Sequence, residues 1–70
     1  MDLYRVWQTG GRNSYWLLGE SAVDAIETVS MTIGVQETQL NAALDREAKY
    51  NVPRGVILNG AGHMTTFFRD

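Results

Sequence analysis

Two short, mostly apolar runs stand in the first twenty positions, Leu3–Gln8 and Ser14–Gly19. Both runs are rich in aromatic and aliphatic side chains, which favour the pleated surface of a sheet. Gly10 and Gly11 stand between the runs and supply the positive φ angles that a tight reversal needs. The pattern therefore predicts an N-terminal β-hairpin.

The next segment changes to a helical period. Ser21 is placed to cap a helix, and Asp24 adds an acid to the first turn, where the helix dipole favours negative charge. The apolar positions that follow at helical spacing are Ala22, Ala25, Ile26, Val29 and Ile33. Gly34 can end the helix in the left-handed conformation. We predict a helix from Ser21 to Ile33.

A second helix is predicted to follow. Thr38 can cap it, and Asn51 and Pro53 end it because proline disfavours helix at the residue before it. Its narrow apolar stripe consists of Leu40, Ala43, Leu44 and Ala48, and its charged surface of Asp45, Arg46, Glu47 and Lys49.

The C-terminal part returns to strand patterns. Gly55–Leu58 is a short apolar run, Asn59-Gly60 is a strong hairpin signal, and His63–Arg69 alternates as a last strand. The order β-β-α-α-β-β predicts an α+β fold in which an antiparallel sheet carries both helices on one face. At this length we expect a single domain over residues 1–70.

Length and composition limit how such a domain is stabilised. A chain of 70 residues buries only about 60% of the surface that its unfolded form exposes, so its own core contributes little stability. The sequence has no cysteine for a disulfide, and one histidine without cysteine does not make an ordinary structural zinc site. We predict no metal and no cofactor. Self-association into a homodimer is the supplement that remains.

Charge and hydropathy exclude two classes of partner. A formal net charge of −2 argues against binding to long nucleic acids, which requires a basic surface. No run approaches the ~20 apolar residues of a membrane span, and the N-terminal residues do not resemble a signal peptide. We expect a cytoplasmic protein with no membrane partner.

The residue pattern gives little support to catalysis. The one histidine, His63, stands beside a glycine-containing turn, where a solvated structural role is the expected one. The segment around Ser21 lacks the second glycine of a nucleophile elbow. The Gly60–Gly62 turn lacks the third glycine and the following helix of a dinucleotide-binding loop. We predict a protein that is not an enzyme.

The N-terminal hairpin carries more aromatic side chains than one face can bury. Either Trp7 and Trp16 face the core and Tyr4 and Tyr15 face outward, or the reverse, and burial of the tryptophans is the expected arrangement. The exposed pair and the nearby arginines have the composition of a protein-contact site, while stacking of a nucleotide base is the competing use. The candidate partner-binding residues are Arg5, Trp7, Arg12, Tyr15 and Trp16.

A second candidate site is basic. Arg46 and Lys49 lie three positions apart on the predicted second helix, and Arg54 follows its end. Gly60 and His63 bound a turn whose backbone N–H groups can hold an anion. If the three basic residues converge on that turn, they would bind a small anionic ligand such as a signalling nucleotide.

The run Tyr4-Arg5-Val6, the glycine turn, the segment Tyr15–Ser21 and the Ala25-Ile26 pair in the helix resemble small phage-encoded and mobile-element ββα proteins. Some of these proteins are anti-CRISPR or other anti-defence inhibitors. The resemblance covers the first half of the chain. It implies a non-enzymatic and often dimeric protein that occupies a site on a host protein or sequesters a small signalling nucleotide.

Three functions follow from these observations. The leading one is a protein-binding inhibitor or adaptor that acts through the hairpin aromatics and arginines. The second is a domain that sequesters a small anionic ligand through the basic residues, at a homodimer interface. The third is an accessory subunit of an enzyme or nucleic-acid complex whose active residues lie elsewhere.

Overall fold

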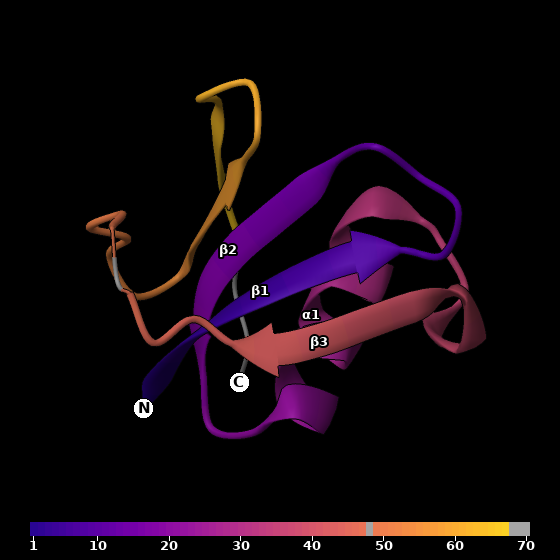
Figure 1. Ribbon diagram of the computed structural model, residues 1–70, viewed down its shortest axis with the longest axis horizontal. Helices are drawn as coiled ribbons and strands as arrows, with labels where there is room; N and C mark the ends of the chain where they lie inside the picture. Colours follow the sequence, from indigo (N-terminus) through magenta and orange to yellow (C-terminus); the bar gives the residue numbers. More distant parts are fainter. Residues whose placement is uncertain (48, 68–70) are drawn as a thin grey trace.

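The computed structural model describes residues 1–47 and 49–67, and in these residues one α-helix packs on a five-stranded sheet (Figure 1). The elements in chain order are β1 (Asp2–Gln8), β2 (Ser14–Gly19), α1 (Ala22–Ile33), the 3-10 turn η1 (Glu37–Gln39), β3 (Leu40–Leu44), β4 (Val56–Asn59) and β5 (Met64–Thr66). Neighbouring strands are antiparallel, and their order across the sheet is β3-β1-β2-β4-β5. The α+β class and the antiparallel sheet confirm the prediction from sequence.

The N-terminal hairpin forms where the glycine pair predicts it. Strands β1 and β2 pair with Asp2 opposite Gly19, and the N–H of Gly11 donates to the C=O of Gln8 at 2.9 Å. Gly10 has a φ of +75°, a conformation that is costly for any residue with a Cβ atom. Glycine at this position therefore sets the point at which the chain reverses.

Helix α1 begins and ends at the residues that the sequence marks. The N–H of Asp24 donates to Ser21 Oγ at 3.1 Å, and the N–H of Glu20 donates to Asp24 Oδ2 at 3.0 Å. The first of these bonds satisfies a backbone donor that the first turn leaves free, and the second ties the residue before the cap to that turn. At the other end, Gly34 has a φ of +76° and donates to the C=O of Ser30.

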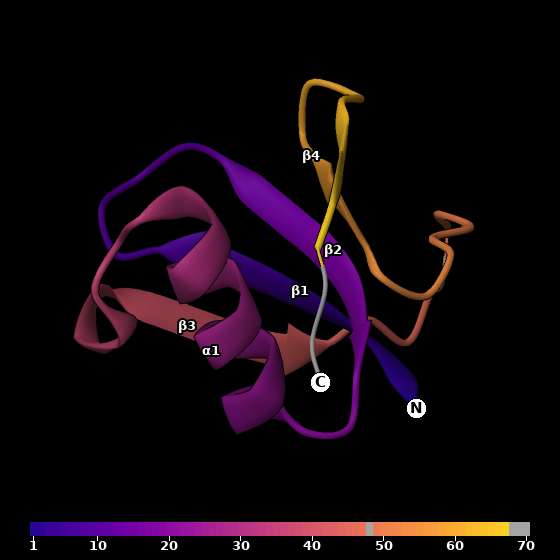
Figure 2. The same ribbon diagram turned by 180° about the vertical axis from the view of Figure 1, so that it is seen from behind.

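Strands β2 and β3 both run antiparallel to β1, so they are parallel to each other. Helix α1 connects them and carries the chain across β1 on one side of the sheet, as the view from behind shows (Figure 2). All of the packing between the helix and the sheet is therefore on one face.

The predicted second helix is wrong. Residues Leu40–Leu44 form the edge strand β3, and the charged residues 45–47 and 49 lie in the loop that follows it. The segment fits both periods, because Leu40 and Leu44 belong to the predicted helical stripe and also, with Ala42 between them, to an alternating set two positions apart. As a strand, Leu40–Leu44 satisfies the backbone groups along the second edge of β1. The stabilisation from this pairing overrides the helix propensity of the segment. Ala48, which the predicted stripe included, lies outside the described residues.

The core lies between α1 and one face of the sheet. Its buried apolar residues are Tyr4, Val6, Leu17, Ala25, Val29, Leu40 and Ile57. Tyr15 packs against this cluster and is partly buried, whereas Trp7 and Trp16 lie on the opposite face. The expectation that the tryptophans fill the core is therefore wrong, and the tyrosines take the core-facing positions of the hairpin. Alternation divides the residues between two faces, but the helix decides which face becomes the core.

The C-terminal hairpin is formed by β4 and β5, with Ile57 opposite Thr65. Strand β5 covers only Met64–Thr66 of the predicted run. Phe68 and Arg69, which the prediction also included, lie outside the described residues. Within the part of the chain that is described, no helix is long and apolar enough to cross a membrane.

Candidate functional site

The sheet face opposite α1, called the helix-free face below, carries Leu3, Arg5 and Trp7 from β1 and Ser14, Trp16 and Leu18 from β2. Arg5 lies opposite Trp16 in the register, and its guanidinium carbon is 4.8 Å from the centroid of the Trp7 ring. Its Nε donates to Ser14 Oγ at 3.0 Å. The ring quadrupole attracts the cation, so these contacts hold the exposed Arg5 side chain against the sheet.

Tyr50, in the loop between β3 and β4, contacts the same face. Its ring centroid is 4.6 Å from that of Trp16, with the ring planes inclined by 50°. On the other side of Trp16, the buried Leu58 of β4 lies opposite it in the register. Trp16 is thus partly covered, while Tyr50 remains 43% exposed. We refer to Arg5, Trp7, Trp16 and Tyr50 as the aromatic cluster.

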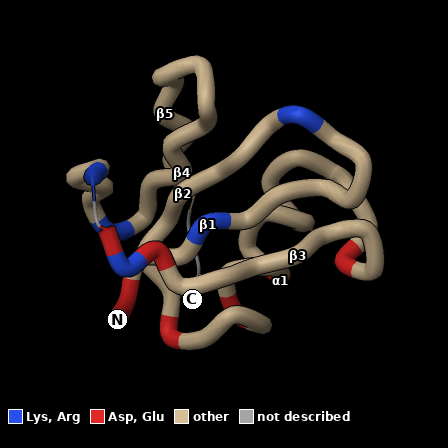
Figure 3. Tube along the Cα trace, viewed as in Figure 1, with Lys and Arg blue, Asp and Glu red and all other residues tan. Residues whose placement is uncertain are grey.

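A groove of about 300 Å³ adjoins the aromatic cluster. Its lining residues are Arg5, Trp16, Ala43, Leu44, Asp45, Glu47, Lys49 and Tyr50. Apart from Arg5 of β1, the charged residues of the lining lie in the loop that follows β3, whereas β3 itself carries no charge along its length (Figure 3). The groove therefore combines an apolar floor with a charged margin.

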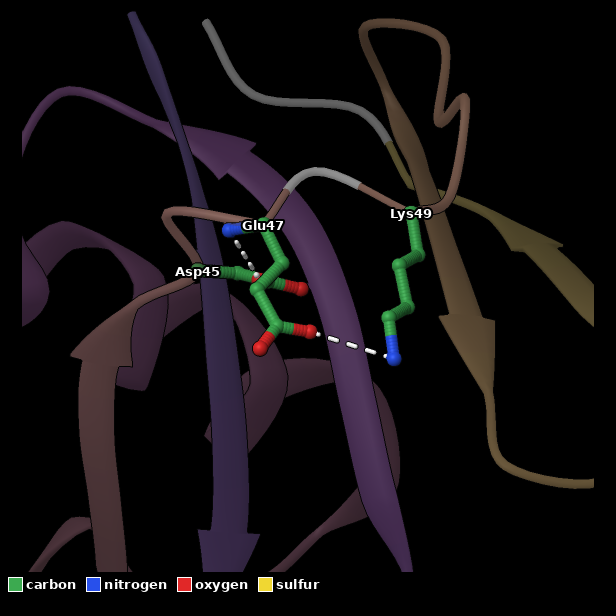
Figure 4. A network of polar contacts seen from close by, with 3 residues as sticks. All are labelled: Asp45, Glu47 and Lys49. Carbon is green, nitrogen blue, oxygen red and sulfur yellow. Dashed lines mark hydrogen bonds and ion pairs between the residues drawn. The ribbon is translucent and has the colours of Figure 1, made fainter.

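Three residues organise this charged margin (Figure 4). Lys49 Nζ lies 3.2 Å from Glu47 Oε2, and the N–H of Glu47 donates to Asp45 Oδ1 at 3.1 Å. The side chains of Lys49 and Glu47 are 72% and 71% exposed, so the ion pair adds little stability. Its effect is to place both signs of charge at the margin of the groove.

The structure brings together three of the five predicted partner-binding residues, namely Arg5, Trp7 and Trp16. Tyr15 faces the core instead, and Arg12 is exposed in the turn between β1 and β2. Sequence reasoning missed Tyr50. No local pattern marks this residue, because its partner Trp16 is distant in the chain and the contact exists only once the loop folds over the sheet.

The predicted basic site does not form one cluster. Lys49 lines the groove, Arg54 lines a different cavity, and Arg46 lines neither. Arg54 precedes β4 and the turn at Gly60 follows it, so the four residues of the strand, at about 3.3 Å each, separate the two. The Arg46 and Lys49 pair also loses its predicted helical spacing, since both residues lie in a loop.

The turn between β4 and β5 uses its own backbone donors. The N–H groups of Ala61 and His63 both donate to Asn59 Oδ1, at 2.9 and 3.1 Å. The N–H of Gly62 donates to the C=O of Asn59, and that of Gly60 to the C=O of Ser14. The donors that would hold an anion are thus already bonded to oxygens of the chain itself.

A larger cavity, of about 630 Å³, lies at another edge of the sheet. Glu20, Asp24 and Arg54 contribute charged groups to it, and Met1 and Phe67 line it as well. Phe67 directly precedes residues 68–70, which are outside the described part of the chain, so we assign no site there.

Within residues 1–47 and 49–67, no three histidine, aspartate or glutamate side chains lie close enough together to hold a metal ion. The fold and the aromatic cluster define the protein as a small α+β domain whose sheet is covered by a helix on one face only. Comparisons with protein-family models, curated proteins and solved structures gave no match.

Proposed function

We propose that the protein is a non-enzymatic binding domain that contacts a partner protein through its helix-free face. One observation carries the proposal: α1 covers a single face of the sheet and leaves the aromatic cluster partly exposed on the other. Tryptophan, tyrosine and arginine are the residue types that dominate binding energy at protein interfaces. The charged margin of the groove matches the polar rim that surrounds such residues.

The sequence pattern of the N-terminal half supports a more specific proposal, that the partner is a host protein and the domain is its inhibitor. The ββα segment resembles phage-encoded anti-defence inhibitors, and the hairpin of that segment supplies Arg5, Trp7 and Trp16 to the aromatic cluster. In this form the domain occupies a site on a host protein in the host cytoplasm. Sequestration of a small anion is the less supported alternative, because Arg46, Lys49 and Arg54 do not line one common cavity.

The positions of the two tryptophans make a direct test available. They are the only tryptophans of the chain, and both lie on the helix-free face. Protein labelled with 5-fluorotryptophan therefore gives two 19F resonances that report on this face alone. Candidate partners captured from a bacterial host are purified and added, and we expect both resonances to shift or broaden.

Matched variants separate the two faces of the domain. Arg5→Glu should weaken binding at least about tenfold, as loss of an interface arginine commonly does. Met31→Glu introduces a negative charge on α1, where Met31 is 78% exposed, and should leave the affinity unchanged. Binding that leaves both resonances in place, or that responds only to Met31→Glu, would show that the helix-free face is not the contact surface.

Sequestration of a small anion, the alternative function, is tested by thermal stability. A ligand that binds only the folded state raises the melting temperature by mass action. A rise with cyclic or linear nucleotides that disappears in Lys49→Ala but persists in Arg5→Glu would favour ligand sequestration over protein binding.

A further inference from the structure

Strand β3 forms one edge of the sheet, and its unpaired edge exposes hydrogen-bonding groups. The N–H of Asp45 donates to the C=O of Leu3, and the N–H of Thr9 to that of Gln39. In an antiparallel ladder these two bonds fix the alternation, so Asn41 and Ala43 exchange hydrogen bonds with β1. Leu40, Ala42 and Leu44 therefore direct their backbone groups away from the sheet.

Only one of these outward groups is bonded within residues 1–47 and 49–67, namely the N–H of Leu40, which donates to the C=O of Glu37. The N–H groups of Ala42 and Leu44 and the C=O groups of all three residues are available. An edge of this kind is a template for another strand.

The strand lacks the features that usually protect an edge. Its sequence, Leu-Asn-Ala-Ala-Leu, contains no charge and no proline, and its backbone contains no bulge in the register with β1. Leu44, at its end, is 45% exposed. The far edge, β5, is shorter, with three residues.

The residues of β3 whose backbone groups point outward are symmetric about Ala42, with a leucine at each end. When two copies of β3 pair antiparallel around Ala42, Leu44 of one copy lies opposite Leu40 of the other, and the two Ala42 residues face each other. All three of these positions point their backbone groups outward, so they are the positions that must exchange hydrogen bonds. The sequence thus fits the isologous contact of a two-fold dimer.

We propose that the protein forms a homodimer in which β3 pairs with β3 of a second copy, in the register centred on Ala42. The pairing makes two hydrogen bonds between the Ala42 residues and two from the Leu44 N–H groups to the Leu40 C=O groups. It joins the two five-stranded sheets edge to edge and covers the exposed Leu44 side chain. The proposal does not depend on the function proposed above.

The axis of such a pairing is perpendicular to the sheet, which fixes where the other elements lie. Both α1 helices occupy one face of the joined sheet, and both aromatic clusters occupy the opposite face. Asn41 of the second copy comes opposite Ala43, a residue that lines the groove. The dimer thus brings a second copy's side chain to the margin of the candidate site.

Light scattering after size-exclusion chromatography tests the association. We expect the wild-type chain to have twice the 7.8 kDa mass of one copy, and Ala42→Pro to have the mass of one. Proline at position 42 removes the outward N–H but none of the hydrogen bonds to β1, as edge positions tolerate. Circular dichroism verifies that the variant is folded. A wild-type mass of one copy up to about 1 mM would overturn the proposal.

Single cysteines test the register, because the natural chain has none. Ala42→Cys places the two sulfur-bearing residues opposite each other, with Cα atoms about 5.5 Å apart, within the range of a disulfide. Ala43→Cys leaves them about 8 Å apart, beyond that range. We expect rapid oxidative cross-linking at position 42 and little at position 43. Equal cross-linking at both positions, or faster cross-linking at 43, would contradict the register even if a dimer forms.

Discussion

Arg5 is held in place before any partner arrives. Its guanidinium group lies over the Trp7 ring, and its Nε donates to Ser14 Oγ. An exposed arginine normally loses rotamer freedom when it enters an interface, and this loss weakens binding. Because its contacts within the sheet already restrict the Arg5 side chain, less freedom remains to be lost. Arg5 is therefore preorganised for contact with a partner.

Tyr50 packs against the Trp16 ring and so limits how much of that ring a partner can contact. We expect Tyr50→Ala to raise the quenching of tryptophan emission by acrylamide and to lower the free energy of unfolding by about 0.5–1.5 kcal/mol, the usual worth of an aromatic pair. Tyr50→Phe keeps the ring and should change neither quantity. Quenching that is the same in the alanine variant and the wild type would show that Tyr50 does not cover Trp16.

At the scale of elements, β3 predicts an alternating response to proline. The N–H of Ala43 donates to β1, so Ala43→Pro leaves a carbonyl of β1 without its donor, whereas the N–H of Ala42 points outward. Ala43→Pro should therefore lower the free energy of unfolding by roughly 1–3 kcal/mol more than Ala42→Pro does. Urea denaturation at low protein concentration, where self-association contributes least, measures the difference. Equal losses would be expected of a helix and would contradict the strand.

The same element shows where sequence reasoning fails. Strands β1 and β2 and helix α1 could be predicted because local signals agree: glycines at the reversal, Ser21 at the cap, Gly34 at the end. Residues Leu40–Leu44 carry no such signal and fit two periods, so the choice between helix and strand rests on β1, which is distant in the chain. Local preference could not reveal that partner.

At the scale of the whole molecule, the candidate site depends on which face the helix covers. The sequence identified Arg5, Trp7 and Trp16, because alternation along each strand separates two sets of side chains. It could not predict that α1 covers Tyr4 and Tyr15, nor that Tyr50 returns to Trp16 from a later loop. Both outcomes depend on packing between distant segments. The aromatic hairpin was therefore visible in the sequence, but its orientation was not.

The proposed dimer and the proposed function together predict avidity. With both aromatic clusters on one face of the joined sheet, a dimer can bind two partner molecules that are fixed on a surface. Linking two binding events in this way raises the apparent affinity, by roughly a hundredfold where the geometry allows both contacts.

Ala42→Pro should remove this gain while leaving the affinity of one site unchanged, because Ala42 lies outside the groove and the aromatic cluster. Surface plasmon resonance at high partner density measures the apparent affinity, and calorimetry in solution measures that of one site. Arg5→Glu should weaken both values in parallel. If Ala42→Pro weakened the solution affinity as strongly as the surface affinity, the second copy would contribute directly to each partner site, where Ala43 and Leu44 line the groove, and the gain would not be avidity.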